Sequence, residues 1–325
     1  MSESKAIRKT SNINSLMLIV WFLLVGGFSL ISEKLTGIFV NSGSDVFDNV
    51  ESLLIFLFQY VIAVPAVFLI FRRKGLKSRI KGIFCKPKKS VWWTLRWIFI
   101  ALFFVYSSNL AGKVLFMIIE MITGVSLSAI DFSADNNAVS VFTNILAMMF
   151  LAPFFEELFF RGNFVEQEAK HGKWSTVIIL GIMFGLWHCN YDQFIYTSVL
   201  GMFAGFMFIK TGSIIPPMLL HFIMNTLGAI SSIMATNSNP AAVYSGELDL
   251  KAILTMCVGF AIFGIMGSGF ILFILEIVLY RDSFKLDGAG KFTEELKTAV
   301  IYITSPATII LIIGLAALTV RNALR

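Results

Sequence analysis

The sequence predicts an all-α protein, a polytopic membrane helix bundle with about eight or nine transmembrane helices. Hydrophobic residues make up 57% of the chain and charged residues only 14%, whereas a soluble domain carries about 25% charged residues. The mean hydropathy is correspondingly high, at +0.81. The apolar residues also gather in segments of roughly 20 residues, which is the length that a helix needs to cross the hydrocarbon layer.

Polar stretches separate the apolar segments into candidate spans. These cover residues 13–31, 52–71, 91–111, 140–160, 174–190, 194–209, 213–235, 252–279 and 300–320. The first segment is too long for the core of a signal peptide, and no small-residue cleavage site follows it, so we expect it to remain as a span.

Positive charge is concentrated in one stretch between the second and third segments. The net charge is +6, and nine Lys or Arg residues lie between Arg72 and Lys89. Because this stretch joins two apolar segments, we expect a cytosolic loop near anionic lipid headgroups and no nucleic-acid partner. The loop 125–139 carries Asp131 and Asp135 but no Lys or Arg, which places it on the opposite side of the membrane.

Two adjacent glutamates lie in the apolar fourth segment, within the stretch FLAPFFEELFFRG. Glu157 and Arg161 are four residues apart, so on a helix they share a face and can form an ion pair. Glu156 is rotated by about 100° from Glu157 and lacks that partner, so its carboxylate is interpreted as free. An interfacial ion pair at the end of a span would explain Glu157 and Arg161 but not Glu156.

Two of the three histidines also lie in apolar segments, His188 within FGLWHCN and His221 within PPMLLHFIMN. Such a histidine can simply hydrogen-bond to a nearby backbone, but ionisable residues within a membrane are functional candidates by default. If the fourth and fifth helices form a hairpin that turns near 171–172, Glu156 and His188 each lie about 24 Å from the turn and hence at one depth. A second turn, TGSIIPP before the seventh segment, is expected on the same side of the membrane, and His221 lies roughly 14 Å from this second turn. Asn225 is four residues further on and shares the face of His221.

Two Glu, two His, an Arg and an Asn can therefore face one polar cavity between three helices. This arrangement is expected for an enclosed catalytic site, although a proton or ion pathway uses similar residues. Against an ion-coupled transporter, the polar residues cluster in one half of the chain, and the two halves show no matching broken segments.

Three motifs carry a resemblance to a known family. EELFFR, FGLWH and HFIMN fit the patterns EExxxR, FxxxH and HxxxN. In order and spacing, residues 140–236 resemble the CPBP family of intramembrane proteases, which includes type II CAAX prenyl endopeptidases and bacterial proteins linked to bacteriocin processing and self-immunity. The chain then divides into N-terminal transmembrane helices (1–139) with the basic loop 72–89, a catalytic helical core (140–236) and C-terminal transmembrane helices (237–325).

The resemblance implies hydrolysis of a peptide bond within the membrane. By this resemblance, Glu156 and His188 would activate the attacking water. His221 and Asn225 would donate hydrogen bonds to the oxyanion of the tetrahedral intermediate, which is usually the largest catalytic contribution.

The same resemblance gives Glu157 and Arg161 a supporting role, in which they hold the fourth helix and its electrostatics in place. A Glu with two His is also a zinc triad, formed here by Glu156, His188 and His221. The HExxH motif is absent and the asparagine suits oxyanion stabilisation better than ligation, so a metal-free glutamic protease is favoured and a zinc metalloprotease is the alternative.

We expect an intramembrane endopeptidase whose partners are membrane lipid and a membrane-associated peptide or protein substrate. The alternative is a non-catalytic membrane protein of the same fold, such as a bacteriocin self-immunity factor or a scaffold. The bacterial members of the family favour a multi-pass protein of a bacterial cell membrane, and the sequence leaves the oligomeric state open. Gly181/Gly185 and Gly201/Gly205 have GxxxG spacing, which we interpret as close helix packing within one bundle rather than dimerisation.

Overall fold

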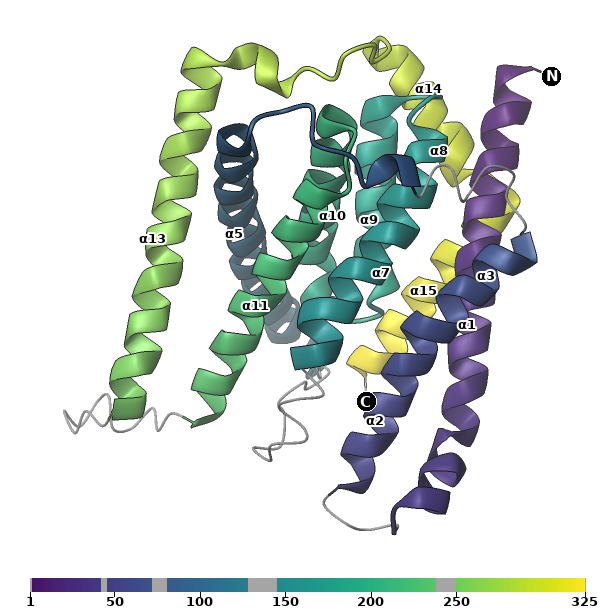
Figure 1. Ribbon diagram of the computed structural model, residues 1–325, viewed down its shortest axis with the longest axis vertical. Coiled ribbons are helices and arrows are strands. Elements are labelled where there is room, and N and C mark those ends of the chain that lie inside the picture. Colours follow the sequence, from purple (N-terminus) through teal and green to yellow (C-terminus); the bar gives the residue numbers. More distant parts are fainter. Residues whose placement is uncertain (1, 42–45, 72–80, 128–144, 238–249, 325) are drawn as a thin grey trace.

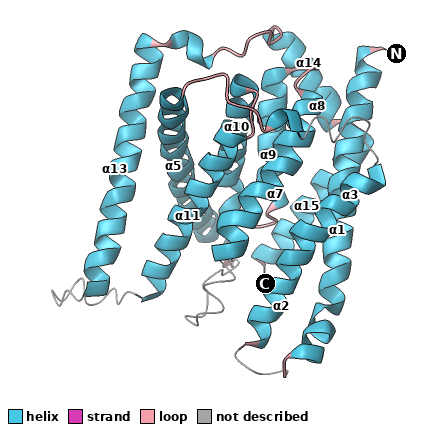
Figure 2. Cartoon of the chain, viewed as in Figure 1, coloured by secondary structure: helices cyan, strands magenta, loops and turns pink. Residues whose placement is uncertain are grey.

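The computed structural model describes residues 2–41, 46–71, 81–127, 145–237 and 250–324, and these residues form helices and loops without any strand (Figures 1 and 2). This confirms the predicted all-α class. Residues 72–80 of the basic loop, 128–139 of the acidic loop and 140–144 of the fourth candidate span lie outside the described residues.

α-Helices account for most of the described residues. In chain order they are α1 (Glu3–Phe39), α2 (Phe47–Leu57), α3 (Val64–Phe71), α5 (Val91–Thr123), α7 (Ala152–Phe159), α8 (Glu166–Glu168), α9 (Lys173–Trp187), α10 (Tyr191–Thr211), α11 (Ile215–Asn237), α13 (Leu250–Leu279), α14 (Phe292–Ile303) and α15 (Pro306–Ala323). Three π-helical turns interrupt this series within the described residues: η1 (Phe58–Ala63), η2 (Ile145–Leu151) and η3 (Phe160–Val165).

Several helical segments are long and apolar enough to cross a membrane. Among the described residues there are six: Glu3–Phe39, Phe47–Phe71, Val91–Thr123, Tyr191–Thr211, Ala252–Leu279 and Pro306–Ala323. The helices α7, α9 and α11 run alongside them (Figure 1), which is consistent with the predicted count of about eight or nine spans.

One predicted span has the wrong boundary. The candidate span 300–320 is divided between two helices, because α14 ends at Ile303 and α15 begins at Pro306. Proline has no backbone N–H and is favoured at the first position of a helix. The chain therefore starts a new helix at Pro306 instead of continuing α14.

The α9–α10 pair forms the centre of the bundle. α5 packs against α10, and α13 packs against α5, while α1 packs against α15 and α2. Figure 1 shows α5 and α13 on one side of this pair and α1, α2, α3 and α15 on the other. The segment that carries the predicted site residues thus lies between the N-terminal and C-terminal helices.

Glycines allow α9 and α10 to approach closely. A methyl group added at Gly185 would lie 2.5 Å from the carbonyl oxygen of Phe194, and one added at Gly201 would lie 3.0 Å from the Cα atom of Gly181. Gly205 makes only ordinary contacts, the nearest at 3.8 Å. Gly181, Gly185 and Gly201 therefore serve packing within one chain, as the sequence predicts.

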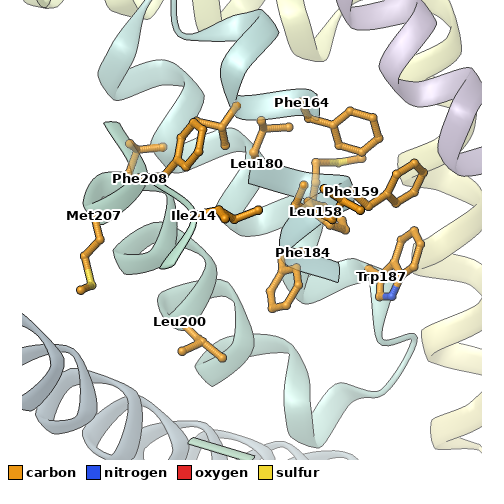
Figure 3. Close-up of a cluster of buried hydrophobic side chains, with 14 of the residues drawn as sticks. Leu158, Phe159, Phe164, Leu180, Phe184, Trp187, Leu200, Met207, Phe208 and Ile214 are labelled. Atoms are coloured by element: carbon orange, nitrogen blue, oxygen red, sulfur yellow. The ribbon is translucent and has the colours of Figure 1, made fainter. Parts of the chain in front are cut away.

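Aromatic side chains fill the space between α7, η3 and α9 (Figure 3). The rings of Phe160 and Phe184 lie 5.0 Å apart between centroids and nearly perpendicular, at 89°. Trp187 contacts the rings of Phe159 and Phe160 at 5.7 and 5.3 Å. Such edge-to-face contacts stabilise beyond simple burial, so this cluster fixes α7 and η3 against α9 and with them the charged side chains described next.

Candidate active site

Two prolines shape the helices that lead into the site. Pro65 and Pro153 each stand two residues after a π-helical turn, η1 and η2. A proline ring collides with the carbonyl four residues earlier and cannot donate to it, and a helix that widens to π geometry relieves this conflict. Both widened turns contribute to the site, since Tyr60 belongs to η1 and Met148 belongs to η2.

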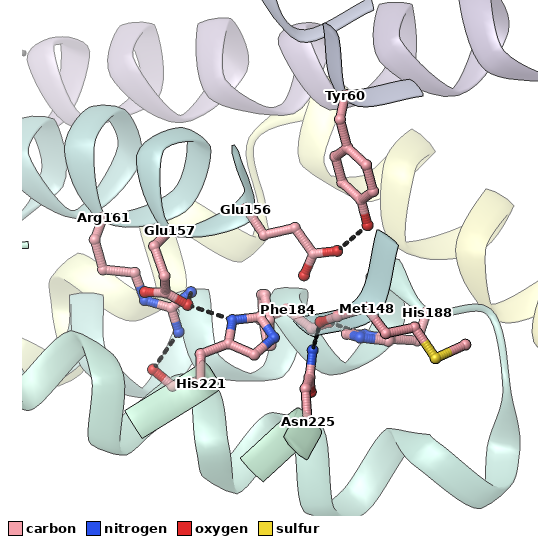
Figure 4. A network of polar contacts seen from close by, with 10 residues as sticks. Tyr60, Met148, Glu156, Glu157, Arg161, Phe184, His188, His221 and Asn225 are labelled. Carbon is pink, nitrogen blue, oxygen red and sulfur yellow. Dashed lines mark hydrogen bonds and ion pairs between the residues drawn. The ribbon is translucent and has the colours of Figure 1, made fainter. Parts of the chain in front are cut away.

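The turn η2 leaves a carbonyl oxygen for Asn225. A π-helical hydrogen bond to the oxygen of Met148 would require an N–H on Pro153, five residues later, which has none. Instead, Nδ2 of Asn225 in α11 donates to this oxygen at 2.6 Å (Figure 4). This bond uses one of the two amide hydrogens, which leaves the other for a molecule in the adjoining cavity.

Glu157 lies at the centre of a buried charged cluster. Its Oε1 accepts hydrogen bonds from Nη1 of Arg161 at 3.1 Å and from Nδ1 of His221 at 2.9 Å (Figure 4). Arg161 also donates from Nη2 to the carbonyl of Gly201 at 3.0 Å, and its guanidinium carbon lies 4.6 Å from the centroid of the Phe184 ring. The predicted pair of Glu157 and Arg161 is therefore confirmed, and it joins α7 and η3 to α10 and α11.

Glu156 has a partner, so its interpretation as free is wrong. The hydroxyl of Tyr60 donates to Oε1 of Glu156 at 2.6 Å. Both residues are buried, with Tyr60 4% and Glu156 6% exposed. The partner is 96 residues upstream, outside the reach of helical spacing. The other carboxylate oxygen, Oε2, is buried and makes no hydrogen bond within the described residues.

His188 ends α9 and is half-buried. Its Nδ1 lies 2.8 Å from the carbonyl oxygen of Phe184. Because a carbonyl oxygen only accepts, Nδ1 carries the proton, and Nε2 of the neutral ring keeps its lone pair. His188 can therefore accept a proton or a hydrogen bond through Nε2.

The residue after His188 has a strained backbone. Cys189 has φ 47° and is, within the described residues, the one non-glycine residue with positive φ. This region costs an L-residue about 1–2 kcal/mol. Asn322 near the end of α15 donates from Nδ2 to the carbonyl oxygen of Cys189 at 2.9 Å, so the C-terminal helix holds the turn that positions His188.

Glu295 of α14 fixes the other end of α9. Gly172 precedes α9 and supplies no side-chain cap, whereas the Glu295 carboxylate accepts hydrogen bonds from the backbone N–H groups of Lys173 at 3.0 Å and Ser175 at 2.9 Å. Burial raises the pKa of Glu295, but hydrogen bonds from Ser175, Lys173 and Gly290 outweigh it, so this pKa lies below the usual value. An ionised carboxylate is favourable at the N-terminus of a helix.

The predicted residues Glu156, His188, His221 and Asn225 line one cavity of about 330 Å³. Tyr60 lines it as well. The rest of the wall is mainly apolar and includes Phe56, Ile145, Met148, Ala152, Leu200, Met224 and Ile233. A mostly apolar cavity with a few converging polar groups is typical of a ligand or active site. Glu157 and Arg161 are not part of this wall. Figure 4 shows them on the side of His221 that faces away from Asn225 and His188.

The side chains of the candidate zinc triad do not gather around one point. Each histidine has the orientation that often supports a metal ligand, since its Nδ1 is held by an acceptor. Even so, the His, Cys, Asp and Glu side chains that the structure describes contain no group of three or more that could hold a metal ion.

The fold and this cavity define a class, that of multi-pass helical membrane proteins with a buried Glu, His and Asn cluster. The model of the family described as type II CAAX prenyl endopeptidase Rce1-like matches residues 138–227, and all six predicted site residues lie in this segment. The segment 138–227 is therefore a CPBP-family domain, as the motifs predict. Its similarity to this family supports the prediction that the protein is a protease, whose substrate is a peptide or a protein. No curated protein and no solved structure matches the chain. Tyr60, Glu295 and Asn322 lie outside the matched segment.

Proposed function

We propose that the protein is an intramembrane endopeptidase of the glutamic type, in which Glu156 and His188 activate the attacking water. One observation carries the proposal. Oε1 of the Glu156 carboxylate accepts a hydrogen bond from Tyr60, Oε2 has no partner among the described residues, and Glu156 lines the same cavity as His188. A carboxylate fixed on one oxygen and open on the other is suited to take a proton from a water molecule.

In the proposed reaction, Oε2 of Glu156 takes one proton from the water, and Nε2 of His188 accepts a hydrogen bond from the other. The water oxygen bonds to the carbonyl carbon of the substrate, and the carbonyl electron pair moves to its oxygen. Collapse of this tetrahedral intermediate breaks the C–N bond, and the proton held by Glu156 passes to the leaving nitrogen. The products are a carboxylic acid, which then ionises, and an amine.

Two donors are available for the oxyanion. Asn225 has one amide hydrogen that the bond to Met148 does not use. The Nδ1–H of His221 is directed at Glu157, so donation to the oxyanion from Nε2 requires a proton on both ring nitrogens of His221. Preorganised donors of this kind typically contribute about 3–4 kcal/mol each to lowering the barrier.

The proposed reaction requires no metal ion. A zinc ion held by Glu156, His188 and His221 would supply Lewis-acid activation of water, but these side chains do not gather into a metal-binding group. No step is therefore assigned to a metal, and chelation provides the test described in the Discussion.

The proposed substrate is a membrane-associated peptide or protein segment of a bacterial cell membrane. The cavity wall around the polar cluster is apolar, which favours apolar side chains next to the scissile bond. The matching family is named for endopeptidases of prenylated CAAX proteins, but a bacterial membrane normally lacks such proteins, so a peptide precursor such as a bacteriocin leader is preferred.

New N-termini in the membrane proteome provide the test. Cells that express the wild-type protein or Glu156→Gln at equal levels are compared by mass spectrometry of protein N-termini. We expect termini that appear with the wild type and are absent with Glu156→Gln, because loss of a general base reduces the rate by about 10² to 10⁴. Identical sets of termini in the two strains would favour the non-catalytic alternative of an immunity factor or scaffold.

A further inference from the structure

A second cavity, of about 530 Å³, lies at the end of the bundle where the basic stretch enters α5. Its wall combines the start of α5, the last turn of α10 and the end of α13 with the turn Arg281–Phe284. Figure 1 shows these three helix ends at the same end of the molecule, with the segment after α13 passing over them. The cavity shares no lining residue with the one at Glu156.

The wall of this cavity is predominantly cationic. The cationic side chains are Lys89, Arg96, Lys210 and Arg281, and the carboxylates are Glu276 and Asp282. The two carboxylates already have partners among the described residues: Glu276 pairs with Arg96 at 3.4 Å, and Asp282 with Lys285 at 2.6 Å. Lys89, Lys210 and Arg281 therefore remain as positive charges that no described carboxylate pairs with.

The wall also contains polar atoms that lack a hydrogen bond. Nε of Arg96 and Oγ of Ser283 are buried donors without a partner among the described residues. Lys210 is only 9% exposed and has one bond, from Nζ to the carbonyl oxygen of Lys285 at 2.6 Å, so two of its three hydrogens remain. Unsatisfied donors are costly where water is scarce, so this group of donors matches a ligand that offers several acceptor oxygens and negative charge, as a phosphate does.

One acceptor in the wall is also without a partner. Oε1 of Glu276 makes no hydrogen bond within the described residues, and Glu276 is 1% exposed. A bare phosphate cannot donate to this oxygen unless it is protonated. A phosphate ester that carries a hydroxyl group, such as the glycerol headgroup of an anionic phospholipid, supplies both the acceptors and the donor.

The cavity lies where lipid headgroups are expected. The candidate span Val91–Thr123 begins beside the cavity, and the candidate span Ala252–Leu279 ends beside it. Two exposed apolar side chains belong to this region: Val278, which lines the cavity, is 68% exposed, and Trp92, the chain neighbour of the lining residue Trp93, is 77% exposed. Tryptophan is enriched at the membrane interface, and basic pockets between helices on the cytoplasmic side bind anionic headgroups.

We propose that this cavity binds the phosphate-bearing, hydroxylated headgroup of an anionic phospholipid in the leaflet that the basic stretch 81–89 faces. The lipid joins three helix ends that are distant in the sequence, since its phosphate contacts Lys89 before α5, Lys210 at the end of α10 and Arg281 after α13. Binding therefore stabilises the packing of α13 against α5 and links both helices to the end of α10.

The test uses the purified full-length protein in a neutral detergent, with short-chain phosphatidylglycerol, phosphatidylcholine and glycerol phosphate as probes. Thermal unfolding and a binding titration are measured for the wild type, for Lys89→Gln/Arg281→Gln, and for Lys81→Gln/Lys86→Gln. The last variant is a matched control, because it removes two exposed lysines of the same stretch that do not line the cavity.

We expect phosphatidylglycerol to bind saturably and to raise the melting temperature of the wild type and the control, while phosphatidylcholine does neither. The cavity variant should bind about 30-fold more weakly, which corresponds to roughly fivefold for each charge removed near a membrane surface. If phosphatidylglycerol binds equally weakly to both double variants, the attraction is diffuse and the proposed binding site in the cavity is wrong. Binding of glycerol phosphate as tight as that of phosphatidylglycerol would overturn the assignment to a lipid, and stabilisation by phosphatidylcholine to the same extent would overturn the selectivity for an anion.

Discussion

The proposed mechanism depends on a hydrogen bond from Tyr60, a residue that lies outside the segment matched by the family model. The substitution Tyr60→Phe tests this dependence. The substitution removes the hydroxyl that donates to Glu156 at 2.6 Å. It keeps the aromatic ring, which stacks with Phe155 at 6.0 Å between centroids. Because Oε2 of Glu156 already lacks a partner in the part of the chain that the structure describes, the variant leaves both carboxylate oxygens without a hydrogen bond from that part of the chain.

A hydrogen bond to a charged group contributes about 1.5–3 kcal/mol. If the whole of this energy is lost from the productive arrangement, kcat/KM falls by roughly 10- to 150-fold. The loss should appear mainly in kcat, because in the proposed mechanism Tyr60 positions the base and the apolar wall of the cavity binds the substrate peptide. The assay is cleavage of a peptide identified from the N-terminal mass spectrometry, with the protein in detergent.

A double-mutant cycle separates positioning from general destabilisation. Since Tyr60 acts through Glu156, the variant Glu156→Gln/Tyr60→Phe should be no slower than Glu156→Gln alone. Tyr106→Phe is the matched control, because the buried Tyr106 hydroxyl has no partner among the residues that the structure describes and its removal should leave the rate unchanged. The reasoning is refuted if Tyr60→Phe cleaves within about twofold of the wild type, or if it slows the Glu156→Gln background by the same factor.

Other parts of the structure give further predictions. Glu157→Gln should lower both activity and melting temperature, because breaking a buried ion pair with Arg161 costs about 3–5 kcal/mol; a stable but inert variant would reverse the roles of the two glutamates. Exhaustive chelation should leave cleavage unchanged, and loss of activity that Zn²⁺ restores would contradict the metal-free proposal. Asn322→Ala should reduce kcat with little change in melting temperature, since it removes the hydrogen bond to the carbonyl of Cys189 in the turn that positions His188. An unchanged rate would show that this turn does not depend on Asn322. The depressed pKa of Glu295 stabilises the fold above the ordinary carboxyl pKa, near 4.5, and this stability is lost as the pH falls below it. Glu295→Gln should therefore cost about 1–2 kcal/mol at neutral pH and flatten the acid side of the stability profile, and an unchanged profile would argue against the cap.

Helical periodicity and chain length were sufficient to predict much of the charged cluster. The four-residue spacing correctly paired Glu157 with Arg161, and it placed His221 and Asn225 on one face of α11. Counting residues from the turn before α9 predicted that Glu156 and His188 share a depth, and both line the same cavity. These inferences succeeded because helix geometry is regular over such distances.

Contacts between distant helices could not be predicted in this way. Tyr60 reaches Glu156 across 96 residues and from a π-helical turn, whose side-chain directions do not follow the ordinary helical period. A weak signal was present, because Gln59 and Tyr60 are polar residues within an apolar span that has a proline at Pro65. The contact of Asn322 with Cys189 left no such signal, since it depends on where α15 ends against the turn after α9.

The charges of the buried cluster explain how the proposed reaction can proceed in an apolar surrounding. The proposed reaction requires two ionised carboxylates, on Glu156 and Glu157, and two positive charges, on Arg161 and His221, so the four side chains together carry no net charge. When Glu156 takes the proton of the water, its negative charge disappears and an equal charge forms on the oxyanion, beside His221. The reaction thus moves a charge within the cluster and creates none, which matters because an uncompensated charge in a medium of low dielectric constant is very costly. Glu157 is essential to this balance, because its single Oε1 atom holds both Arg161 and His221.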